Sequence, residues 1–188
     1  MLNKLFPETN YEKLQYDNEG LYSITNYKEA DIISSIIKNN FITNNNLRIY
    51  DGTGGLGGNT ISFSKHFKNV TAVEINKERC NMLVNNVNHY KLSNVKIIND
   101  DSVEFLLKNK NNFDIYFFDP PWGGPDYKKH KEIRFKMGGY DLYDLAEKLD
   151  INKLLIFKLP FNYDFSEFNN FNYKLYKINK YFIIIILL

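Results

Sequence analysis

Short apolar segments alternate with helix-like segments along most of this chain, and that alternation limits its fold more than any other feature. Segments rich in β-branched and aromatic residues span 47–52, 69–75, 94–100, 113–119 and 153–159. The intervening periodicity predicts helices over 58–67, 77–89, 103–108 and 141–149. Two final apolar segments, 173–179 and 181–188, are nearly contiguous and predict a hairpin. The pattern predicts an α/β fold with a mostly parallel seven-stranded sheet, one antiparallel strand and helices on both faces.

Length and composition narrow the classes of protein further. The 188 residues are enough for one core, so we expect a single domain over 1–188. A net charge of +2 allows only a local contact with nucleic acid. The lone Cys80 excludes an internal disulfide and a cysteine cage for a metal. The start of the chain is too polar for a secretory leader, and 181–188 is too short to cross a membrane. We therefore expect an intracellular monomer, nuclear or cytoplasmic and not secreted, that binds neither a membrane nor a metal.

A glycine-rich motif, "YDGTGGLGGNT", follows the first expected strand and precedes a helix. Gly52, Gly54 and Gly57 satisfy the G-x-G-x-x-G pattern, which lets a cofactor approach bare backbone N–H groups. Glu74 ends the next strand, where a carboxylate can accept hydrogen bonds from a ribose. Both features are shared by enzymes that bind nicotinamide dinucleotides and enzymes that bind S-adenosylmethionine.

Two aspartates favour S-adenosylmethionine over a dinucleotide. Asp51 stands directly before the first glycine, where its carboxylate would attract the ammonium group of a methionine moiety and repel a pyrophosphate. Asp101, after the third strand, can accept from an adenine amino group while the Ser102 backbone N–H serves a ring nitrogen. Asp101 could equally cap the helix that follows it. Alternation, glycine loop and terminal hairpin together resemble the layout of the Rossmann-like class I methyltransferases.

The segment "DPPWGGPDY", 119–127, follows the fourth strand and predicts the chemistry. An exocyclic amine on a nucleobase is a poor nucleophile because its lone pair is delocalised into the ring. If the Asp119 carboxylate and the Pro120 carbonyl both accept from the amine, the lone pair turns toward the methyl donor and developing positive charge is stabilised. Trp122 would stack on the base, since its immediate sequence neighbours offer nothing apolar to bury it. The segment predicts an aminomethyltransferase.

"PPWGGPDY", "GGNT" and "EGLYSIT" together resemble the trimethylguanosine synthase family, which methylates N2 of a 7-methylguanosine RNA cap. The resemblance implies that Trp122 stacks on 7-methylguanine and that Tyr127 reaches the cap phosphates. It also implies an N-terminal arm, residues 1–30, that covers cofactor and cap. The cofactor contacts implied by the arm and by the end of the glycine loop are Tyr22, Thr25, Asn59 and Thr60.

This chain departs from the family at three positions. Asp119 stands where the family usually has serine, Gln15 where it has a phosphate-binding lysine, and Phe161 where it has an arginine. Lys13 and Lys158 lie close to the last two positions and are the candidates to bind phosphate instead. The charged run 127–136 offers further cations near the catalytic loop, although such runs are usually solvated.

These observations predict methyl transfer from S-adenosylmethionine to N2 of a 7-methylguanosine cap, on capped RNA or the cap nucleotide. Three alternatives stay open at this point. An adenine-N6 or other nucleobase aminomethyltransferase would use the same Asp119 and Trp122. A non-enzymatic cap-binding subunit would keep Trp122 and lose the cofactor site, and a nicotinamide oxidoreductase would explain only the glycines.

Overall fold

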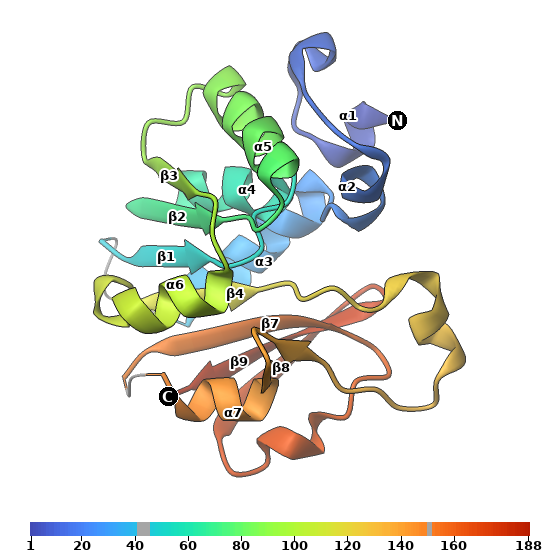
Figure 1. The fold of residues 1–188 in the computed structure, drawn as a ribbon, viewed down its shortest axis with the longest axis vertical. Coiled ribbons are helices and arrows are strands. Elements are labelled where there is room, and N and C mark those ends of the chain that lie inside the picture. The colour runs from blue at the N-terminus through green and yellow to red at the C-terminus, as the bar shows by residue number, and fades with distance from the viewer. Residues whose placement is uncertain (41–45, 150–151) are drawn as a thin grey trace.

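A seven-stranded sheet in the order β3-β2-β1-β4-β7-β9-β8 forms the centre of the protein (Figure 1). The computed structural model describes residues 1–40, 46–149 and 152–188. β9 runs antiparallel to both of its neighbours, whereas the pairs from β3 to β7 are parallel. The strands are β1 Arg48–Asp51, β2 Asn69–Val73, β3 Val95–Ile98, β4 Ile115–Phe118, β7 Leu154–Pro160, β8 Asn172–Ile178 and β9 Tyr181–Leu187. The predicted α/β fold, with one antiparallel strand in a mostly parallel sheet, is confirmed.

Helices cover both faces of this sheet, as the alternation predicts. The helices are α1 Leu2–Leu5, α2 Asn18–Ser23, α3 Tyr27–Asn39, α4 Gly58–His66, α5 Lys77–His89, α6 Ser102–Asn109 and α7 Leu142–Glu147, with short 3₁₀ turns η1 Tyr11–Lys13, η2 Lys110–Asn112, η3 Gly124–Lys129 and η4 Phe165–Phe168. α3 and α4 pack on one face and α6 and α7 on the other. The four helices expected after residue 57 are present, with ends that differ from the predicted ones by no more than two residues.

Strand β4 shows why the central strands are apolar throughout. All four of its residues are buried: Ile115 and Phe117 belong to the core under α3 and α4, whereas Tyr116 and Phe118 belong to the core under α6 and α7. A parallel strand covered on both faces has no side chain directed at water, so alternation between polar and apolar residues is lost. Packing on both faces of β4 therefore fixes the position from which the next loop starts.

Two parts of the fold went beyond the predicted elements. A small hairpin, β5 Lys136–Met137 and β6 Tyr140–Asp141, lies between β4 and α7. The N-terminal arm contains helices, and α3 begins at Tyr27, so the arm itself ends at about residue 26. Asn26 caps α3 by accepting a hydrogen bond from the Glu29 backbone N–H, which fixes where the arm ends and the helix starts.

Candidate active site

The loops that follow β1 and β4 meet at the point where the strand order reverses. The chain leaves β1 toward β2 and β3 on one side, and returns to β4 on the other side of β1. In open α/β sheets, ligands bind at the carboxyl ends of the strands beside such a reversal. The Asp119 backbone N–H donates to the Thr53 hydroxyl at 2.8 Å, so the glycine loop and the loop 119–127 are joined directly.

The Asp119 side chain is held by two partners that come from distant parts of the chain. Its Oδ2 atom lies 2.6 Å from the Lys158 ammonium in β7 and accepts a longer hydrogen bond, 3.4 Å, from the Thr25 hydroxyl in the arm. Burial raises the pKa of Asp119 above its ordinary value, and the neighbouring Lys158 charge opposes that shift. The carboxylate is therefore fixed through one oxygen.

Two acceptors at the end of β4 are left without partners in the described part of the chain. They are the Asp119 Oδ1 atom and the Pro120 carbonyl oxygen. The sequence predicted these two groups as the acceptors for the two N–H bonds of an amine. Because Oδ2 is already engaged, Asp119 offers the amine one oxygen and not two.

Trp122 is more enclosed than its sequence neighbours indicate. Its ring packs edge-on against Tyr127, with ring centroids 5.3 Å apart, and at 6.2 Å from Tyr181 of β9. The indole N–H donates to the Lys158 carbonyl at 3.3 Å. The expectation that no apolar neighbours enclose the indole is wrong, because the neighbours come from elements far away in sequence. The side chain is half-buried and keeps some exposed surface.

The candidates for phosphate binding lie in three different environments. Tyr127 is buried, and its phenol makes no hydrogen bond within the described residues. Lys158 is only 5% exposed and is paired with Asp119, so its ammonium does not extend toward solvent. Lys13 lies in the arm beside α5, where its carbonyl accepts from the Asn85 amide. The structure does not bring Lys13 and Lys158 together.

In the charged run 127–136, several side chains are already paired. Arg134 pairs with Asp164 at 2.5 Å, Lys129 with Asp126 and Lys136 with Asp141. Lys128 lies over the ring of its neighbour Tyr127. Three cations of this run are therefore paired with aspartates that lie outside it, and much of the run is a solvated surface, as charged runs usually are.

The first two motif glycines are needed for close packing. A Cβ atom on Gly52 would lie 2.2 Å from the Phe118 ring, and one on Gly54 would lie 2.7 Å from a Leu83 methyl group. The Gly54 backbone N–H donates to the Val73 carbonyl of β2. The absence of side chains here lets the loop lie flat between β4 and α5. Gly57 has a left-handed backbone, with φ of 102°, as the turn into α4 requires.

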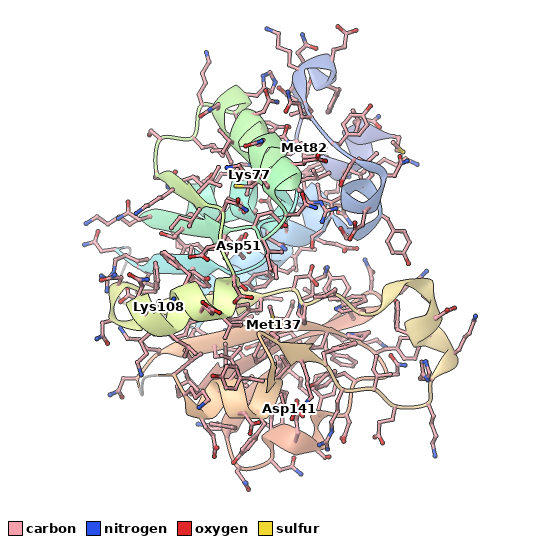
Figure 2. All side chains as sticks on the ribbon, viewed as in Figure 1. Asp51, Lys77, Met82, Lys108, Met137 and Asp141 are labelled. Carbon is pink, nitrogen blue, oxygen red and sulfur yellow. The ribbon has the colours of Figure 1, made fainter. Side chains whose placement is uncertain are left out.

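Asp51 and Thr60 form a buried pair inside the glycine loop. The Thr60 hydroxyl donates to Asp51 Oδ2 at 2.6 Å, and the Thr53 backbone N–H donates to Oδ1 at 3.2 Å. Both side chains are fully buried, and Figure 2 shows Asp51 deep inside the molecule. Their direct contact with a cofactor stays a prediction, because in this structure both serve to shape the loop.

We expect Asp51→Asn to change the pH dependence of stability. Burial raises the pKa of Asp51 to about 6 from 3.8, so the folded state retains its proton at pH values where the unfolded chain has lost it. Stability from this group is complete below pH 3.8 and is lost as pH rises through about 6. The unfolding free energy of wild type should fall relative to that of Asp51→Asn by about 1 kcal/mol between pH 5 and 8.

Urea denaturation at several pH values measures this difference. Asp144→Asn on α7 is the matched control, because it makes the same substitution at an exposed aspartate. A constant gap between wild type and Asp51→Asn would contradict the prediction.

Asn59 and Thr25 connect the glycine loop with the arm. The Asn59 amide donates to the Thr25 hydroxyl at 3.2 Å, and Lys158 donates to the same hydroxyl at 3.0 Å. Asn59 is 6% exposed, and its carbonyl oxygen Oδ1 has no hydrogen-bond partner within the described residues. A buried polar atom without a partner is rare and costly, so a donor from a ligand would be accommodated here.

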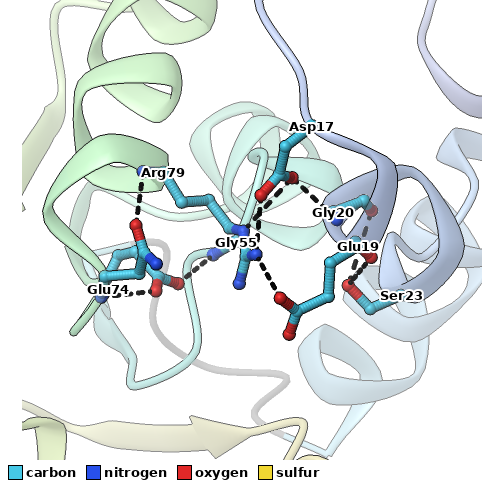
Figure 3. Close-up of polar contacts among 8 residues, drawn as sticks. Asp17, Glu19, Gly20, Ser23, Gly55, Glu74 and Arg79 are labelled. Atoms are coloured by element: carbon cyan, nitrogen blue, oxygen red, sulfur yellow. Dashed lines mark hydrogen bonds and ion pairs between the residues drawn. The ribbon is translucent and has the colours of Figure 1, made fainter. Parts of the chain in front are cut away.

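Glu74 ends β2 with both carboxylate oxygens directed at backbone N–H groups. Oε2 accepts from Gly55 and Oε1 from Asn76, each at 2.9 Å (Figure 3). Each oxygen can still accept a second hydrogen bond, since an ionised carboxylate has about four acceptor positions. The side chain is thus fixed beside the glycine loop with capacity left for ligand hydroxyls.

Of the remaining predicted cofactor contacts, two lie at the start of α6 and one in the arm. Asp101 caps α6, since its Oδ1 atom accepts from the Val103 and Glu104 backbone N–H groups. Ser102 is the first residue of that helix, and its carbonyl accepts from the Tyr50 hydroxyl. Tyr22 is 62% exposed on α2, so in this structure its ring does not line an enclosed site.

Arg79 holds the arm against the first turn of α5, a role that the sequence did not reveal. Its guanidinium pairs with Asp17 at 2.7 Å and with Glu19 at 2.9 Å (Figure 3). The Arg79 hydrogen bond keeps the pKa of Asp17 below its ordinary value. Asp17 also caps α2 through the Gly20 backbone N–H. Because the partners are about sixty residues apart, no local pattern connects them.

Neither a metal site nor a membrane-spanning helix is found among residues 1–40, 46–149 and 152–188. No group of three or more histidine, cysteine, aspartate or glutamate side chains there is arranged to hold a metal ion. None of the helices in that part of the chain has the length and apolar character needed to cross a bilayer.

Comparison with known proteins gives a match over most of the chain. The family model described as RNA cap guanine-N2 methyltransferase matches residues 45–186. An uncharacterised protein of Acanthamoeba polyphaga mimivirus is 37% identical, over 94% of this chain and 79% of its own length. The trimethylguanosine synthase of Saccharomyces cerevisiae is 27% identical over 78% of this chain. The match spans 44% of the yeast protein's length.

Solved structures share the fold at lower identity. A precorrin-6y methyltransferase from Geobacter metallireducens superposes with a TM-score of 0.63, covering 93% of this chain and 94% of its own, at 13% identity. At that identity the likeness concerns the fold alone. The fold is that of the Rossmann-like methyltransferases.

Proposed function

Because the chain belongs to the RNA cap guanine-N2 methyltransferase family, and is a methyltransferase by family and fold, we propose that it transfers a methyl group from S-adenosylmethionine to N2 of a 7-methylguanosine RNA cap. One observation supports this most: two acceptors at the end of β4, Asp119 Oδ1 and the Pro120 carbonyl, have no partner within the described residues, and Trp122 follows them in the same loop. An amine with two N–H bonds next to a flat base matches that arrangement.

The two acceptors act on the amine nitrogen. Hydrogen bonds to Asp119 and Pro120 turn the nitrogen lone pair out of conjugation with the ring. The Asp119 charge stabilises the positive charge that develops on nitrogen as the new bond forms. The alkylated nitrogen then loses a proton readily, so no dedicated base is needed.

The residues around the glycine loop fit S-adenosylmethionine. Glu74 would accept from the ribose hydroxyls, and the unpartnered Asn59 Oδ1 atom would accept from the ammonium of the methionine moiety. Asp101 and the Ser102 backbone N–H would meet the adenine. When bound, this cofactor supplies an electrophilic methyl group on a sulfonium. Asp51, also predicted to attract the ammonium, would contribute its charge at longer range through the loop it shapes.

Trp122 and the arm would form the cap side of the site. The half-buried indole offers a face for the base, and a cationic 7-methylguanine gains a cation-π attraction there that guanine lacks. Tyr127 would support that ring edge-on. In the same proposal the chain is one domain whose arm, up to about residue 26, closes over both ligands through Thr25.

Incubation with labelled S-adenosylmethionine and equal concentrations of 7-methyl-GTP, GTP and ATP tests the proposal. We expect label on 7-methyl-GTP alone, recovered at N2 after digestion to the base. Transfer to ATP at a comparable rate would favour the adenine-N6 alternative. Cap binding without any transfer would favour the non-enzymatic alternative.

Replacing Glu74 with glutamine should weaken S-adenosylmethionine binding about 10- to 100-fold, because a ribose hydroxyl pair loses a charged acceptor. Calorimetry with the cofactor measures this change, and quenching of Trp122 by 7-methyl-GTP should be unaffected. Glu78→Gln is the matched control, since Glu78 lies four residues away and is exposed on α5. Unchanged cofactor affinity in Glu74→Gln would show that the ribose does not lie at Glu74.

A further inference from the structure

Lys158 is a charged side chain in a strand that is buried along its whole length. All seven residues of β7 are buried, and Lys158 is 5% exposed. Phe157 of β7 pairs with Phe118, the last residue of β4. Lys158 follows Phe157 and Asp119 follows Phe118, so these two residues lie at the same level. A lysine is rarely buried unless its charge is paired. Its contacts therefore indicate what it does.

The Lys158 ammonium contacts several parts of the candidate site. It lies 2.6 Å from Asp119 Oδ2 and donates to the Thr25 hydroxyl at 3.0 Å. The ring centroids of Trp122 and Tyr181 lie 5.1 and 4.8 Å away, within the range of a cation-π attraction. One ammonium thus contacts the predicted catalytic carboxylate, the predicted stacking ring and the arm.

We propose that Lys158 is a positioning residue that keeps Asp119 ionised and turns its free oxygen, Oδ1, toward the methyl-accepting amine. The proposal rests on the role given to Asp119 in the proposed function. Lys158 occupies Oδ2, so the carboxylate cannot rotate to present either oxygen at random. Lys158 itself does not touch the substrate. Positioning of Asp119 is thus its proposed role, in place of the phosphate binding that its position in the sequence suggested.

The charges around Asp119 show why it needs this partner. Burial raises the pKa of Asp119, and Lys158 is the cation that lowers it again. The other titratable groups that face this carboxylate are Asp51 from β1 and Tyr181 from β9, and neither carries a positive charge. Without Lys158, Asp119 would bind a proton at higher pH and lose the charge that stabilises the alkylated nitrogen.

Trp122 is the only tryptophan of the chain, which gives a direct probe of this pair. Its fluorescence should change as Asp119 titrates, in wild type and in the Lys158 variants, because Asp119 lies three residues before the indole and its charge acts on the ring through space. The Asp119 transition is identified as the one that Asp119→Asn removes. In Lys158→Met it should move to higher pH by at least about one unit. Lys153→Met is the matched control, since Lys153 precedes the same strand and pairs with Asp114 at 3.6 Å.

Kinetics on 7-methyl-GTP give a second readout. In Lys158→Met, kcat at pH 7 should fall at least about tenfold and recover partly at higher pH, with little change in KM. In an Asp119→Asn background, adding Lys158→Met should change kcat by less than about twofold, because the charge it serves is gone. If Lys158→Met does not fold, Lys158→Gln carries the same test, since glutamine keeps a donor and removes the charge.

The outcomes separate this inference from the proposed function. The fluorescence titration requires no methyl transfer, so it keeps its meaning if the substrate is not a cap. An Asp119 transition that stays in place in the Lys158 variants would overturn the inference. A rise in KM for the triphosphate in both Asp119 backgrounds, with an unshifted transition, would instead identify Lys158 as a phosphate ligand and overturn it as well.

Discussion

Asp119→Asn is expected to lower kcat for methyl transfer by at least about 100-fold, the usual effect of removing one group that stabilises charge in a transition state. Asparagine keeps the shape of the side chain and can still accept from Lys158, so the loop should stay in place. Asparagine lacks the negative charge that stabilises the positive charge developing on the amine nitrogen. Binding of 7-methyl-GTP should change little, because stacking on Trp122 is retained.

Single-turnover rates at saturating cofactor, together with affinities from Trp122 quenching, measure the two effects separately. Asp114→Asn is the matched control. Asp114 directly precedes β4 as Asp119 directly follows it, and it is also paired, with Arg48 at 3.0 Å. Loss of that pair should alter stability and leave kcat unchanged. Turnover of Asp119→Asn close to wild type would show that the carboxylate charge is not part of the mechanism.

The sheet could be predicted from the sequence because each strand can be recognised from its own residues. Strand β4, with four buried residues, can be recognised without knowing its neighbours. The hairpin of β8 and β9 follows from the short separation of two apolar segments. The same holds for parts of the site that directly follow a strand, such as Glu74 after β2 and Asp119 after β4. Their position at the strand ends follows from the alternation alone.

The pairing of Asp119 with Lys158 could not be predicted in this way. It depends on β7 lying beside β4 and on the register that aligns Phe118 with Phe157. From the sequence, Lys158 was a candidate to replace the phosphate-binding arginine that is missing at Phe161. In the structure Lys158 instead pairs with Asp119 at the start of the loop 119–127. Arg79 and Asp17 illustrate the same limit, since only the folded arm brings them together.

Burial was also misjudged where neighbours come from distant strands. Trp122 has proline and glycine neighbours in sequence, yet Tyr181 of β9 and the backbone of Lys158 lie against it. Asp51 was expected to meet a ligand, yet Thr60, on the next turn of chain, takes its carboxylate. In both cases packing sets the partners within the chain, and the contacts with ligands stay predictions.

Replacing Trp122 with alanine should lower kcat/KM on 7-methyl-GTP by at least about 100-fold and abolish most of the preference for 7-methyl-GTP over GTP. Wild type should prefer the methylated nucleotide by about tenfold, since the cation-π attraction contributes roughly 1 to 2 kcal/mol. The preference should lie near the lower end of that range, because the Lys158 ammonium already lies 5.1 Å from the indole. Trp122→Phe should keep part of it.

The half-buried position of Trp122 makes a stability control necessary. Trp122→Ala removes packing against Tyr127 and Tyr181, so its melting temperature should fall together with its activity. Ile178→Ala is the matched control, because Ile178 is buried in the core cluster against which Trp122 packs. That variant should lose stability and keep the nucleotide preference. Equal kcat/KM on GTP and 7-methyl-GTP in the wild type would contradict the assignment of the cap as substrate. Loss of the nucleotide preference in Ile178→Ala would show that the preference depends on packing and not on stacking on the indole.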